Sequence, residues 1–274
     1  MVPTWLITDT QTWTVPVTGN YRLICIGKGG DGGDGGVLVH NSSSSNNYYP
    51  YMFPSAAGGG GAVAIADRTL TVNDILNLNI SDSQTDINGT ALIATAGTDG
   101  IDGSAGTYYK SRYPSSVTYP TIPGGTASGT WLTYGYNGNN GESPETTVTY
   151  STYNAEKSGY NSTPIYQGGN VGCIILTPAI NGNAGMGAFN GPYTDGIRGY
   201  AYPYTGSGTF TSDDISDTCR TTLANGGHPG GGGAGAQSAV YYFTQSSGST
   251  TLYSLSATGG KGGIGTILIQ FLGE

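Results

Sequence analysis

Glycine recurs at every third position in several stretches of this 274-residue chain, and this spacing limits the folds open to it. Residues 27–36 carry two such series side by side, and residues 100–106 and 182–185 repeat the interval. A period of three is that of the extended left-handed polyproline II helix, which forms no hydrogen bonds within itself. The backbone amides of these stretches must therefore find partners in neighbouring segments.

The glycine tracts are better explained as packed segments than as linkers. Further tracts lie at residues 58–61, 230–233 and 259–263, and apolar strand-like segments adjoin them. Flexible linkers are typically rich in serine and are not followed each time by an apolar strand. Glycine also lets backbones approach closely. We therefore predict a bundle of extended glycine segments. Collagen is excluded, because no triplet repeat runs the length of the chain and only 13 residues are proline.

Short segments rich in Val, Ile, Thr and Tyr lie between the glycine tracts and predict strands. They occupy residues 11–16, 21–26, 62–72, 75–80, 90–95, 171–176, 239–243, 252–255 and 266–272. Turns are predicted at residues 18–20 and 73–74 and at Asn88-Gly89. Residues 212–224 alone have a helical pattern, with a serine cap and Gly226 as a stop.

The predicted fold class is therefore all-β, with almost no helix. We expect one domain over residues 1–274: a β-sandwich-like framework with glycine-rich, polyproline-II-type segments and long Tyr/Gly-rich loops. The framework would comprise about 11–100 and 237–274, and the inserted Tyr/Gly-rich region about 101–236.

The charge pattern narrows the possible partners. The chain has nine Lys and Arg residues and 17 Asp and Glu residues. The two basic residues nearest to each other in the sequence are Lys110 and Arg112. A phosphate backbone requires several clustered cations, so no nucleic acid partner is expected. The sequence has neither a run of 18 apolar residues nor a basic, apolar leader. We therefore expect that the protein is made in a cytoplasm and does not insert into a membrane. The odd set Cys25, Cys173 and Cys219 predicts free, buried thiols.

Motifs for bound cofactors are incomplete. Residues 30–35 match the dinucleotide pattern G-x-G-x-x-G, but no helix follows to hold a phosphate. Residues 29–34 begin like a calcium-binding nonapeptide repeat, yet Gly35 stands where a large apolar residue is needed. Calcium at Asp31 and Asp34 is one interpretation, and solvent-facing aspartates between glycine segments are the favoured one. Asp99 and Asp102 have the same two interpretations. The Ser212-Asp213-Asp214 cluster predicts a helix start. We predict no metal and no cofactor.

Catalytic patterns are also absent from the sequence. His40 and His228 stand alone, and neither a G-x-S-x-G elbow nor a P-loop occurs. Glu142, Glu145 and Glu156 leave open a carboxylate pair for glycoside cleavage, which is the third and weakest hypothesis. The sequence predicts no enzyme and no catalytic residues.

Tyrosine, with 21 copies, is the chemically informative residue type. In the middle of the chain and in a loop over residues 40–54 it alternates with Ser, Thr, Gly and Asn. Antibody binding loops use the same residue types, because tyrosine offers a large amphipathic contact area at a small entropic cost. The alternative is that many tyrosines form cross-strand pairs or cover the glycine segments. The candidate binding residues are Tyr48, Tyr49, Tyr51, Tyr108, Tyr109, Tyr113, Trp131, Tyr134, Tyr136, Tyr200, Tyr202 and Tyr204.

The order of motifs along the chain is distinctive. They are W-T-V-P at 13–16, G-G-G-G-A at 58–62, T-L-T-V at 69–72, L-I-A-T-A-G at 92–97 and G-G-K-G-G-I-G-T-I-L-I-Q-F at 259–271. Taken together, they resemble the glycine-rich receptor-binding domain of bacteriophage tail-fibre and adhesin proteins, over about residues 13–106 and 259–272. Relatives tend to have a Pro-Gly turn where this chain has Asn73-Asp74.

The resemblance implies a tail-fibre tip in the virion, often a homotrimer and assembled in the host cytoplasm, whose variable loops bind a host surface protein or polysaccharide. No shaft-like segment precedes Trp13, so attachment to other tail proteins is expected through another protein or through residues 1–10. The alternative is a non-adhesive structural virion protein, such as a tail-fibre joint or a capsid decoration, whose tyrosines are buried against neighbouring subunits.

Overall fold

A computed structural model describes residues 3–34, 36–42, 47–53, 55–102, 117–143, 147–148, 169, 172, 201–204, 229–233, 239–244, 250–255 and 259–274. This part of the chain is all-β and contains no helix. In chain order its strands are β1 (Thr4–Ile7), β2 (Gln11–Thr14), β3 (Gly19–Ile26), β4 (Gly36–Ser42), β5 (Asn47–Phe53), β6 (Val63–Leu70), β7 (Ile75–Ile80), β8 (Gln84–Ile87), β9 (Leu92–Thr95), β10 (Val117–Thr118), β11 (Ala127–Ser128), β12 (Tyr134–Tyr136), β13 (Thr147–Val148), β14 (Ala201–Tyr204), β15 (Ala239–Thr244), β16 (Thr250–Leu255) and β17 (Thr266–Gly273).

Two five-stranded antiparallel sheets form the part of the molecule that we call the framework. One has the strand order β1-β17-β3-β6-β12 and the other β11-β9-β8-β7-β2. The central strands β3 and β17 join the two ends of the chain, with Ile24 paired to Leu268. The framework therefore forms only when the beginning and the end of the chain meet.

Alternating side chains of the framework strands enter one hydrophobic core. In β3, Tyr21, Leu23 and Cys25 have no exposed surface, and they join a cluster that includes Leu78 and Ile87 of the second sheet. The hydroxyl of Tyr21 donates to the carbonyl of Val17 at 2.7 Å, which satisfies its polar end. The two sheets are thus joined by side-chain burial, the dominant favourable term in folding.

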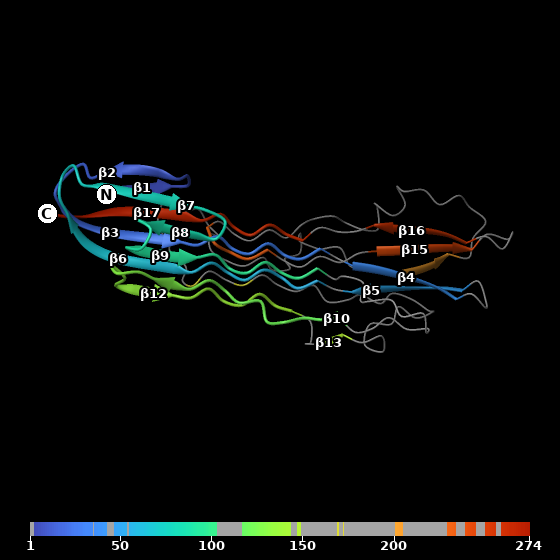
Figure 1. The fold of residues 1–274 in the computed structure, drawn as a ribbon. Helices are drawn as coiled ribbons and strands as arrows, with labels where there is room; N and C mark the ends of the chain where they lie inside the picture. Colours follow the sequence, from blue (N-terminus) through green and yellow to red (C-terminus); the bar gives the residue numbers. More distant parts are fainter. Residues whose placement is uncertain are drawn as a thin grey trace.

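Glycine-rich segments leave the framework strands and run side by side (Figure 1). We call this region the glycine bundle and define it by residues 27–34, 55–62, 96–102, 122–126, 137–142, 169, 172, 230–233 and 259–265. Its segment 55–62 is buried throughout. Among the described residues, six other segments surround it, and it bonds to each of them through its main chain.

The bonds of segment 55–62 follow a period of three. The amides of Ala56, Gly59 and Ala62 donate to residues 95–101, at 2.8 to 3.1 Å. Those of residues 57 and 60 donate to residues 139–142, and those of 58 and 61 to residues 230–233. Its carbonyls accept from residues 27–33, from 169 and 172, and from 125. For the described tracts, our prediction that their amides bond to neighbouring segments is confirmed. The predicted tract at 182–185 and residues 103–106 lie outside the described residues.

The glycine bundle continues the pairing of the strands at both of its ends. The β3–β6 ladder ends at Ile26 opposite Val63, and the next bond runs from the Gly27 amide to the Ala62 carbonyl, at 2.9 Å. Beyond the bundle the same two chain segments pair again, as β4 and β5. The same two chain segments thus pair as β3 and β6, as glycine tracts, and as β4 and β5.

The strands beyond the bundle lie far from both chain termini (Figure 1). They form the β4–β5 hairpin, the β10–β13 pair and the sheet β14-β15-β16, in which β14 and β15 are parallel. We call these the distal strands. Both termini lie at the framework end of the elongated molecule (Figure 1).

Most of the sequence-predicted strands are present within one to three residues of their expected ends. The predicted strand at 171–176 and the predicted helix at 212–224 lie outside the described residues, as do Cys173 and Cys219. Nine strands escaped the sequence analysis. They are β1, which falls in the possible attachment segment 1–10, the polar β8, the five short strands β10 to β14 of the predicted insertion, and β4 and β5, which replace the loop predicted over residues 40–54. Within the predicted insertion 101–236, β11 and β12 pair with framework strands, whereas β4 and β5 of the predicted framework are distal strands.

Candidate functional site

The twelve candidate binding residues fall into three groups. In the distal strands the structure places Tyr48, Tyr49, Tyr51, Tyr202 and Tyr204. At the framework end it places Trp131, Tyr134 and Tyr136. Outside the described residues lie Tyr108, Tyr109, Tyr113 and Tyr200. The structure therefore separates residues that the sequence treats as one set.

Trp131 has a structural environment. Its side chain is partly buried and packs against the framework core. The guanidinium carbon of Arg68 lies 5.0 Å from the centre of its ring, a cation–π arrangement. Its amide also donates to the carbonyl of Ala91 at 2.7 Å. Arg68 of β6 thus contacts the indole, and the bond to Ala91 fixes the backbone of residue 131 beside the residue that precedes β9.

Tyr134 and Tyr136 are exposed, by 51% and 42%, on the edge strand β12. They pair in register with Ile65 and Val63 of β6. Two residues along β6 from Ile65, the Asp67 carboxylate accepts two hydrogen bonds from Arg22, at 2.7 and 2.8 Å. These bonds lower the pKa of Asp67. The surface is accessible, but it lies at the framework end, away from the distal strands (Figure 1).

The distal strands bring aromatic residues from distant parts of the sequence into rows. Tyr202 of β14 lies opposite Tyr241 of β15, which lies opposite Tyr253 of β16. Two positions further along, Tyr204 lies opposite Phe243. Sequence reasoning selected the two β14 tyrosines and missed the β15 and β16 residues, because the parallel pairing of β14 with β15 spans 39 positions and leaves no local signal.

Aspartates of the glycine tracts bond to backbone amides of neighbouring segments. Asp99 Oδ1 accepts from the Asp31 amide at 2.8 Å, and Asp31 Oδ1 accepts from the Gly262 amide at 2.9 Å. The same bonds recur three residues further along, at 2.8 Å each, and involve Asp102, Asp34 and Gly259. Each carboxylate replaces a backbone carbonyl as the acceptor at the bundle surface. We call these two rows the aspartate ladder.

Two lysines lie beside the aspartate ladder. Lys261 Nζ donates to Asp31 Oδ2 at 2.8 Å, and Lys28 Nζ lies 3.9 Å from Asp31 and 3.2 Å from Asp82. Partial burial disfavours the charged form of Asp31, but the bonds from Lys261 and Gly262 and the charge of Lys28 outweigh this effect. The pKa of Asp31 is therefore lowered.

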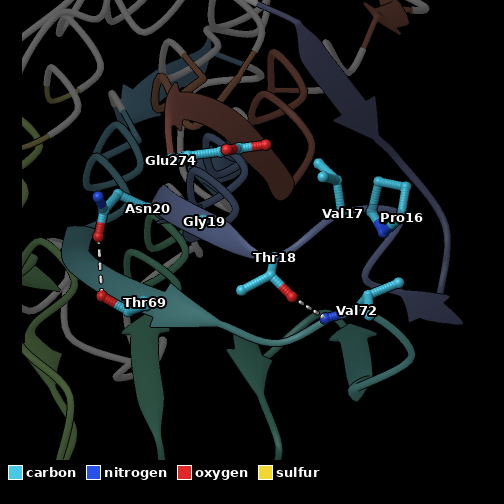
Figure 2. A pocket seen from close by; sticks show the side chains of 8 residues that line it. All are labelled: Pro16, Val17, Thr18, Gly19, Asn20, Thr69, Val72 and Glu274. Carbon is cyan, nitrogen blue, oxygen red and sulfur yellow. Dashed lines mark hydrogen bonds between the residues drawn. The ribbon is translucent and has the colours of Figure 1, made fainter.

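An open pocket of about 460 Å³ lies at the framework end, beside Glu274. Thr69 Oγ1 donates to Asn20 Oδ1 at 2.7 Å, and the Val72 amide donates to Thr18 Oγ1 at 3.0 Å (Figure 2). Glu274 is the one charged residue of its lining. No other side chain of this lining is a carboxylate or an imidazole.

Two kinds of feature are absent from the described residues. Within them no group of three or more His, Cys, Asp or Glu side chains is arranged to hold a metal ion. No helix in this part of the chain is long and apolar enough to cross a membrane. Of the three glutamates considered for glycoside cleavage, Glu142 lies at the end of a bundle segment, where its carbonyl accepts from Ala57. The other two, Glu145 and Glu156, lie outside the described residues.

Comparison with known proteins adds no relative: no family model matches the chain, and no curated protein is recognisably similar to it in sequence.

Proposed function

We propose that this chain is a bacteriophage tail-fibre tip that binds a host-cell surface receptor through its distal strands. The observation that carries the proposal is the separation of the two ends of the molecule. Both termini lie at the framework end, and the tyrosine-rich strands β5, β14 and β15 lie at the other (Figure 1). A receptor-binding tip requires this polarity, because attachment and recognition must not compete for one surface.

The glycine bundle supports the proposal through its rigidity. Its segments bond to one another through main-chain amides and carbonyls, so the distal strands are held by a fixed scaffold rather than by a flexible linker. Rigid presentation of aromatic side chains lowers the entropic cost of binding. If several chains assemble in one fibre, avidity would increase the binding further.

The test is staining of a broad panel of bacterial strains with the fluorescently labelled chain. We expect saturable staining of a narrow set of strains, lost in the double variant Tyr49→Ser/Tyr51→Ser. The matched control Tyr134→Ser/Tyr136→Ser removes two tyrosines at the framework end and should stain as the unchanged chain does. Absence of staining by the folded chain would instead favour the structural virion protein. Loss of staining in the control alone would move the receptor site to β12.

A further inference from the structure

The open pocket at the framework end is built by three segments of the chain (Figure 2). Residues 16–20 run into β3, residues 69–72 lie at and beyond the end of β6, and residue 274 follows β17. The described side chains of its lining are apolar, uncharged polar and acidic, namely Pro16, Val17 and Val72, then Thr18, Asn20 and Thr69, and finally Glu274. Apolar walls and a carboxylate therefore border one space.

Hydrogen bonds fix the apolar walls of this pocket. The hydroxyl of Tyr21, whose ring is buried in the framework core, donates to the carbonyl of Val17. On the other side, the amide of Val72 donates to Thr18 Oγ1 (Figure 2). Val17 and Val72 are both exposed, yet each is bonded through its own main chain. A ligand thus meets walls that are already ordered, which lowers the entropic cost of binding.

A β-bulge at the end of β17 places the carboxylate. The pairing of β17 with β3 shifts register between Phe271 and Gly273, so that Gly273 lies opposite Asn20. Gly273 has a φ of +121°, a conformation that residues with a side chain rarely adopt. A bulge bends its strand and re-aims the side chains beside it. Glu274 follows this bulge directly and borders the pocket.

The charge of Glu274 is not balanced within the described lining, which contains no Lys, Arg or His. The four basic residues of the described chain have contacts elsewhere, and they are Arg22, Lys28, Arg68 and Lys261. The formal net charge of the whole chain is −8, which favours the approach of a positively charged partner. The pocket therefore offers its carboxylate to a cation that none of these four residues supplies.

We propose that this pocket binds a lysine or arginine side chain of a neighbouring protein. Such a side chain has an apolar stem and a cationic end, and it buries the stem on apolar surface while the charge stays near water. Val17 and Val72 contact the stem, and the Glu274 carboxylate accepts a charge-assisted hydrogen bond from the cation. That the neighbour is another tail protein rests on the receptor-binding function proposed above, whereas the chemistry of the pocket does not.

Other ligands fit the pocket less well. A phosphate or a carboxylate would be repelled by Glu274, and a wholly apolar ligand gains nothing from it. The location also suits a neighbouring protein, because the pocket lies at the framework end with both chain termini (Figure 1). A protein bound there leaves the distal strands uncovered.

The test uses tripeptides that differ only at the end of the central side chain. Acetyl-Gly-Lys-Gly-amide is compared with its norleucine counterpart, and acetyl-Gly-Arg-Gly-amide with its citrulline counterpart. Titrations of the isotope-labelled full chain follow the amide NMR signals of Val17, Thr18 and Val72. We expect saturable shifts with both basic peptides and about fivefold weaker binding of the neutral ones, the scale of one exposed ion pair. Equal binding of the neutral peptides, or no shift of these signals with either basic peptide, would overturn the proposal.

Two variants separate the carboxylate from the apolar wall. Glu274→Gln should weaken the basic peptides to the level of the neutral ones, whereas Glu142→Gln, at the other described glutamate, should keep the difference. Val72→Ser should weaken all the peptides by about threefold through lost apolar contact. Its control is Ile75→Ser, at a residue that is 62% exposed and outside the lining.

Two results would contradict these roles. If Glu274→Gln bound the basic peptides as the unchanged chain does, the carboxylate would have no part in binding. If Val72→Ser and Ile75→Ser behaved alike, the stem would not lie on the apolar wall. The outcome is independent of the receptor-binding function, because a chain that binds the basic peptides and stains no bacterial strain contradicts that function alone.

Discussion

The framework and the glycine bundle both pair their backbone amides and carbonyls. They differ in their side chains, because the framework packs side chains between its sheets whereas the bundle leaves almost no room for them. A framework strand bonds to at most two neighbours within its sheet and leaves both faces for side chains such as Leu23 and Leu78. The bundle segment 55–62 bonds in six directions and leaves almost no room for a side chain. The comparison shows that a buried interior can be built from main chain alone, provided that glycine permits contact on every side.

The largest expected effect comes from adding one methyl group to the bundle. A Cβ at Gly58 would overlap the carbonyl of Gly30, a backbone atom that cannot rotate away. We expect Gly58→Ala to cost about 4 kcal/mol in unfolding free energy, from overpacking and a displaced hydrogen bond. The control is Gly89→Ala, where φ is +73° and the space is open, with an expected cost of about 1 kcal/mol. Chemical denaturation measures both, and equal costs would contradict the crowding argument.

The next largest effect is expected when side-chain volume is removed from the framework core. Leu23 has no exposed surface, and Leu23→Ala should cost about 3 kcal/mol through lost burial and a cavity. Leu132, which is 36% exposed, is the control and should cost less than about 0.5 kcal/mol as Leu132→Ala. All three tryptophans lie in or beside the framework, so their fluorescence follows that region. If Leu23→Ala and Gly58→Ala shift the same fluorescence transition, the two regions unfold together.

A smaller effect concerns the aspartate ladder and its pH dependence. The folded pKa of Asp31 is lowered, so its stabilising contribution is present above the unfolded pKa of about 3.9 and is lost as pH falls through the folded value. At pH 7, Asp31→Asn should cost about 1 kcal/mol, and the difference should vanish at strongly acidic pH. Thermal melts from pH 7 to pH 2 measure it. Asp82→Asn is the control and should cost little, because the Asp82 side chain is 96% exposed.

The smallest effect tests the contact between Arg68 and Trp131. Arg68→Met removes the cation from the ring and should cost about 0.5–1 kcal/mol. Arg68→Lys keeps a positive charge and should recover part of the loss. Unfolding followed by tryptophan fluorescence provides the measurement, and a cost above about 2 kcal/mol would show that the methylene stem of Arg68 matters more than its charge.

Local patterns allowed much of the fold to be predicted from the sequence, and contacts between distant segments account for what was missed. Strands with alternating apolar residues, such as β3 and β17, needed no tertiary information. Strand β8 escaped because Asp86 is buried in it. That carboxylate is tolerated only because Asn79, Gln84 and the amide of Gly89 all donate to it at 2.8 Å. Two of these donors, Asn79 and Gly89, lie outside Gln84–Ile87, so the sequence of the strand does not show that its carboxylate is satisfied.

The candidate site was predictable to a similar extent. Its residue type, tyrosine, was evident from composition, but its grouping in space was not. Trp131 packs on the core because Arg68, 63 positions earlier, lies over it. Asp34 bonds to the amide of Gly259, 225 positions away. Only the fold brings such residues together, so the sequence could not distinguish binding aromatics from structural ones.

The repeat of three in the glycine bundle sets a rule for how its length can change. One residue added to a segment would rotate every later amide toward the wrong neighbour, whereas three residues restore the direction of each bond. At roughly 3.1 Å per residue, the distance between the framework and the distal strands can therefore grow only in steps of about 9 Å, with all parallel and antiparallel segments lengthened together. The length of this protein can therefore take only a series of fixed values.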